Sequence, residues 1–65
     1  MDPNQAFLDM FRAMRDGDHE TARERALALQ EWFAKGGFTP YQFSRQAMEA
    51  YIASVLRRTS HLDFD

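Results

Sequence analysis

The stretch of residues 32–43 carries the strongest helix-stop and helix-start signals in the chain, together with five of its nine aromatic residues. Gly36 and Gly37 suit a helix end, because one residue there commonly takes a left-handed conformation that lets the last carbonyls find donors. Thr39 then fits an N-cap and Pro40 fits the first helical position. The stretch therefore predicts a sharp corner between two helices.

Two side-chain pairings support this corner. Gln42 follows Thr39 by three residues, which is the spacing of a capping box. Phe38 precedes the cap and Phe43 occupies the fourth helical position, so the two rings form a hydrophobic staple. We expect the helix after the corner to span about residues 40–58.

The first helix is predicted over about residues 3–15. Asp2 provides its N-cap, and Gly17 ends it. Apolar side chains recur at helical spacing and are expected to share one buried face. This face comprises Phe7, Met10, Phe11 and Met14.

The second helix is predicted over about residues 19–35, with Asp18 as its N-cap. Leu27 lies on the side away from its apolar face and is expected to be exposed. Small residues near the Gly17 turn permit a close approach, so the first two helices should pack antiparallel as a hairpin. The apolar face of the second helix comprises Ala22, Ala26, Leu29 and Phe33.

The composition limits how these helices assemble. The chain has 65 residues and no cysteine, so we expect one domain (residues 1–65) that has a thin core and no disulfide. The expected fold is an all-α, small three-helix bundle with a short C-terminal tail, residues 59–65. This tail is either frayed or loosely docked through Leu62 and Phe64.

The third helix has more apolar surface than one groove requires. A stripe of Met48, Ile52 and Val55 lies beside a second stripe of small residues, and the apolar arc covers roughly 200°. Two arrangements are compatible with this arc. In one, the third helix contacts both other helices and uses both stripes. In the other, the small stripe packs inside and the larger stripe is left for a partner.

The second arrangement leads to a functional hypothesis. A methionine-bearing apolar groove suits adaptable protein contacts, and a small chain often gains stability by association. We therefore expect a protein–protein interaction module that forms a homo-oligomer, most simply a dimer, or binds another protein. The hypothetical interface comprises Met48, Tyr51, Ile52, Val55 and Leu56.

Other classes of function receive little support from the residues. His19 and His61 are far apart in sequence, and the carboxylates fall at caps or on solvated faces, so we expect no enzyme, no metal site and no cofactor. There is no long apolar run for a membrane span and no start resembling a signal peptide, so the cytoplasm is the expected compartment.

DNA binding is the alternative hypothesis. The corner and the first turns of the third helix resemble the pattern of a helix-turn-helix, whose second helix reads base edges. The net charge of −2 and the scattered basic residues argue against it, because phosphate contact needs a concentrated basic face. The candidate contact residues are Thr39, Tyr41, Gln42, Arg45 and Gln46.

Overall fold

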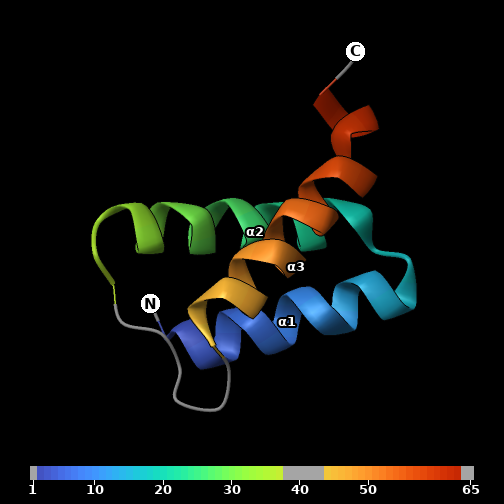
Figure 1. Ribbon diagram of the computed structural model, residues 1–65. Coiled ribbons are helices and arrows are strands. Elements are labelled where there is room, and N and C mark those ends of the chain that lie inside the picture. The colour runs from blue at the N-terminus through green and yellow to red at the C-terminus, as the bar shows by residue number, and fades with distance from the viewer. Residues whose placement is uncertain (1, 38–43, 64–65) are drawn as a thin grey trace.

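The computed structural model describes residues 2–37 and 44–63, and these form three α-helices and a short 3-10 helix. The α-helices are α1 (Pro3–Asp16), α2 (His19–Ala34) and α3 (Arg45–Arg58), and the 3-10 helix is η1 (Ser60–Asp63). Helices α1 and α2 run antiparallel as a hairpin, and α3 crosses them diagonally (Figure 1). The predicted all-α three-helix bundle is confirmed. Within these two ranges, no helix is long and apolar enough to cross a membrane.

Both ends of α1 and the start of α2 have the predicted caps. The Asp2 side chain accepts a hydrogen bond from the Asn4 amide at 3.0 Å and begins α1. Gly17 ends it in the left-handed region at φ 77°, where its amide and that of Asp18 donate to carbonyls of the last turn. The Asp18 side chain in turn accepts from the Thr21 amide at 3.2 Å. Asp18 therefore closes one helix with its backbone and opens the next with its side chain.

The end of α2 repeats this closing motif. Gly36 takes φ 84°, and its amide donates to the Phe33 carbonyl at 3.0 Å. The Gly37 amide donates to the Trp32 carbonyl at 2.9 Å. These are the two hydrogen bonds that characterise a Schellman helix end. Of the two glycines expected to form the corner, Gly36 is therefore the one that takes the left-handed conformation.

The start of α3 differs from the prediction. The described helix begins at Arg45, and Ser44 is its N-cap, with an extended backbone and a side chain that accepts from the Ala47 amide at 3.1 Å. The extended Ser44 prevents an unbroken helix from Pro40, because an N-cap residue lies outside the helical region. The other predicted corner features lie outside the described residues. These features are the Thr39 cap, the Gln42 capping box and the Phe38–Phe43 staple.

The core confirms the predicted face of α2 and corrects that of α1. Phe7 and Met10 are buried as expected, and Met14 is partly buried. Phe11, however, is 49% exposed, because it lies at the rim where α1 meets α3, and Ala6 and Ala13 take the inner positions. The core residues of α2 are Ala22, Ala26, Leu29 and Phe33.

The third helix contacts both other helices, as in the first of the two expected arrangements, but it does so through its larger stripe and not through both stripes. Its buried residues are Met48, Ile52 and Val55, each at most 3% exposed. Ala47 and Ala50, from the small-residue stripe, face solvent instead. Burying a large aliphatic side chain stabilises the fold by about 1.5–3 kcal/mol, which is more than an alanine can contribute, so the larger stripe faces inward.

The end of α3 is anchored to α2. Thr59 is fully buried, and its hydroxyl donates to the Val55 carbonyl at 2.8 Å. Arg23 of α2 donates to the Leu56 carbonyl and to the Thr59 hydroxyl, both at 3.1 Å. Thr59 therefore belongs to the packed bundle and not to a loose tail.

Candidate interaction surface

The predicted interface of α3 is not a free surface. Met48, Ile52 and Val55 lie in the interior of the single chain, and Tyr51 and Leu56 are half-buried against the core. Tyr51 and Leu56 are also five positions apart, which places them about 140° apart around the helix. The hypothesis that this stripe waits for a partner is therefore wrong, because the α1–α2 hairpin already covers it.

A different apolar surface lies between α1 and α3. The Tyr51 ring packs against Phe7 with a centroid distance of 5.6 Å and stacks on Phe11 at 6.0 Å, with 29° between the two ring planes. Phe7 is buried, whereas Phe11 and its neighbour Leu8 are 49% and 44% exposed. We call Leu8, Phe11 and Tyr51 the aromatic face.

Arginines flank the aromatic face. Arg15 follows Phe11 by four residues and Arg58 follows Tyr51 by seven, so each lies on the same side of its helix as the ring. The mid-helix carboxylates of α1 and α3, Asp9 and Glu49, are engaged on other sides of these helices, and Glu49 pairs with Arg45 at 2.9 Å. Asp9 of α1 pairs with Arg25 of α2 at 3.7 Å. Among the described residues, Arg15 itself pairs with the neighbouring Asp16 alone, in an exposed contact of 3.4 Å. The aromatic face therefore has a positive border.

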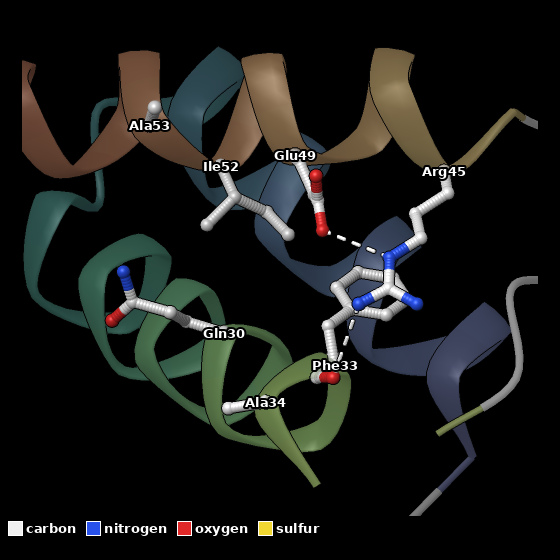
Figure 2. A pocket seen from close by; sticks show the side chains of 7 residues that line it. All are labelled: Gln30, Phe33, Ala34, Arg45, Glu49, Ile52 and Ala53. Carbon is white, nitrogen blue, oxygen red and sulfur yellow. Dashed lines mark hydrogen bonds and ion pairs between the residues drawn. The ribbon is translucent and has the colours of Figure 1, made fainter. Parts of the chain in front are cut away.

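A groove of about 300 Å³ lies on the other side of α3, against α2. Figure 2 shows Arg45 reaching across this groove from the start of α3 to the end of α2. Its guanidinium donates to Glu49 at 2.9 Å and to the Phe33 carbonyl at 3.2 Å, and lies 5.5 Å from the centre of the Phe33 ring. The remaining residues that line the groove are Gln30, Ala34, Ile52 and Ala53.

The groove serves the packing of the bundle. Phe33 is at the end of α2, where carbonyls lack partners within the helix, so a cation is favourable there. Arg45 supplies this cation, and Glu49 balances its charge. The polar groups at this end of the groove are thus paired with one another, and we assign no ligand to it.

The residues proposed for DNA contact do not converge in the described structure. Thr39, Tyr41 and Gln42 lie outside the described residues. Arg45 is held by Glu49 and the Phe33 carbonyl, so its charge is already balanced. Gln46 is exposed. Of this set, the described part of the chain offers one unengaged polar side chain and no concentrated basic patch.

The two histidines, which looked unrelated in the sequence, meet in the structure. The His19 and His61 rings lie 5.3 Å apart in an edge-to-face arrangement. Helix α3 returns along α2, and this brings η1 to the beginning of α2. The sequence analysis did not consider that α2 and α3 run in opposite directions, which places the end of α3 beside the start of α2. No group of three metal-ligating side chains occurs within residues 2–37 and 44–63.

The shifted pKa values belong to helix ends and surface pairs. Hydrogen bonds from the side chain and backbone of Thr21 lower the pKa of Asp18. The Lys35 ammonium, 2.8 Å from Glu31, lowers the pKa of that carboxyl, and Glu31 raises the pKa of Lys35 in return. All three groups are exposed, so these shifts reflect local hydrogen bonding and not a desolvated acid–base site.

Comparison of the chain with models of protein families, with curated proteins and with solved structures finds no match. The residues and their geometry are therefore the basis for a functional proposal.

Proposed function

We propose that this chain is a small helical protein–protein interaction module that associates with copies of itself through the aromatic face. The observation that carries this proposal is the position of Phe11, which stacks on Tyr51 yet leaves half of its surface in water. Stacking holds the Phe11 ring in place. A large, rigid aromatic side chain at the surface is the kind of residue that anchors protein interfaces.

The size of the aromatic face predicts a weak association. Full burial of a leucine or phenylalanine side chain contributes about 1.5–3 kcal/mol, and Leu8 and Phe11 are already about half-buried in the monomer. Translational and rotational freedom must also be lost on binding. We therefore place the contact among small, transient interfaces and expect association to become visible only at high protein concentration.

Sedimentation across a wide concentration range tests this proposal. The wild-type chain should show a mass that rises with concentration, and Phe11→Glu should remain a monomer with unchanged helicity. Leu62→Glu is the matched control, because Leu62 is similarly exposed at 41% but lies in η1, away from the aromatic face. A monomeric wild type at every concentration, or Phe11→Glu that associates like wild type, would disprove the proposal.

A further inference from the structure

We propose that the aromatic face of one copy docks on the solvent-facing stripe of α2 in a second copy. This inference rests on the proposed function, because it names the partner of the same face. The stripe, which we call the acidic stripe, comprises Glu20, Glu24, Leu27 and Glu31.

The acidic stripe has one apolar side chain within a row of carboxylates. Its members are spaced at i, i+4, i+7 and i+11, so they follow one side of α2. All are exposed, and Leu27, at 44%, is the apolar residue among them. Glu24 contacts Arg25 at 2.9 Å and Glu31 contacts Lys35 at 2.8 Å. Exposed pairs of this kind contribute little, so an arginine from another copy can compete for these carboxylates.

The two surfaces complement each other in charge and in spacing. The aromatic face has Arg15 four residues after Phe11, and the acidic stripe has Glu31 four residues after Leu27. Four residues correspond to a rise of about 6 Å in both helices. A copy that sets Leu27 against Phe11 can therefore also bring Glu31 within reach of Arg15.

Charge also argues against pairing of like surfaces. Two aromatic faces that pair with their α1 helices parallel would bring Arg15 and Arg58 of one copy against the same arginines of the other. Two acidic stripes centred on Leu27 would oppose their glutamates in either direction, since Glu24 and Glu31 lie on both sides of Leu27. Juxtaposed like charges disfavour an interface, whereas opposite charges steer the partners together. The contact between an aromatic face and an acidic stripe buries the apolar residues of both surfaces. It also pairs the arginines beside the aromatic face with the glutamates of the stripe.

The unlike contact has a structural consequence. Figure 1 shows α1 and α2 side by side as a hairpin, with α3 crossing over both, and the acidic stripe lies on the exposed side of α2 whereas the aromatic face joins α1 and α3. The aromatic face and the acidic stripe are therefore separate surfaces, and a docked pair still has one free aromatic face and one free acidic stripe. Such a head-to-tail contact extends into rows or rings and does not stop at a two-fold dimer.

A mixing experiment tests this inference. Phe11→Glu blocks the aromatic face and Leu27→Arg blocks the acidic stripe, so each variant alone should be a monomer. An equimolar mixture should form a 1:1 complex, because the first variant keeps its stripe and the second keeps its face. Association of the wild type should weaken several-fold between low and high salt, as expected for exposed charges. Circular dichroism checks that each variant folds. If Phe11→Glu does not fold, Phe11→Ser takes its place, and if Leu27→Arg does not fold, Leu27→Ser takes its place.

The outcomes separate this inference from the proposed function. If Phe11→Glu is monomeric while Leu27→Arg associates like wild type, the aromatic face binds a surface other than the acidic stripe. This result overturns the inference and leaves the proposed function standing. A mixture that stays monomeric also overturns it, since unlike surfaces then do not pair. If both variants associate like wild type, or the wild type is itself monomeric, the proposed function fails together with the inference.

Discussion

Replacing Ile52 with alanine distinguishes a core role from an interface role for α3. Ile52 is 3% exposed, and removing its outer carbons costs the transfer free energy plus a cavity term, which together amount to about 2–5 kcal/mol. Because Ile52 also borders the groove between α2 and α3, water can enter part of the space, and we expect a loss of about 2–3 kcal/mol. A domain of this length has a net stability of only about 3–10 kcal/mol, so the change removes a large share of it.

Urea denaturation followed by circular dichroism at low protein concentration measures this loss. Low concentration keeps the chain monomeric, so that only the intramolecular role of Ile52 contributes. Leu62→Ala is the control and should lower the free energy of unfolding by about 1 kcal/mol or less, because Leu62 is already 41% exposed in the folded chain and lies outside the buried core. A loss below 1 kcal/mol for Ile52→Ala, combined with a reduced mass at high concentration, would refute the core assignment and restore the interface hypothesis.

Three further changes test local parts of the fold. Ser44→Ala should lower the free energy of unfolding by about 1 kcal/mol, since it removes the N-cap acceptor of α3, and an unchanged thermal midpoint would contradict this helix start. Thr59→Val should cost about 1–2 kcal/mol in urea denaturation, since Arg23 loses a buried hydroxyl acceptor but keeps a carbonyl, and equal stability would show that this bond is dispensable. Hydrogen bonds from Thr21 lower the pKa of folded Asp18, so its contribution is fully present above the unfolded pKa and is lost as pH falls through the folded pKa. Asp18→Asn should therefore flatten the acid side of the stability–pH profile, and an unaltered slope would exclude this contribution.

Local chemistry made the helix ends readable from the sequence. Asp2, Asp18 and Gly17 act through partners within a few residues of themselves, so their roles follow from sequence spacing alone. Sequence spacing does not decide the start of a helix where two residues nearby could both serve as the N-cap. Thr39 and Ser44 both suit an N-cap, and the described α3 begins after Ser44.

The sequence predicted only in part which side of each helix faces the core. The α2 face was predicted correctly because alanines, leucine and phenylalanine leave a single apolar side. The α3 helix has two usable sides, and its sequence does not state which one the hairpin covers. The rim position of Phe11 has the same origin, because a wide apolar face on α1 does not reveal where a third helix crosses it.

The sequence by itself thus determined that the described chain has three α-helices, the caps at both ends of α1 and at the start of α2, the glycine end of α2, and the buried side of α2. These features depend on contacts within one or two helical turns. Only the tertiary structure decided that Met48, Ile52 and Val55 face inward, that His19 meets His61, and that the aromatic face stays at the surface. The physical reason is that the crossing of α3 over the hairpin is set by how three surfaces pack together at once. No single helix contains that information in its own periodicity.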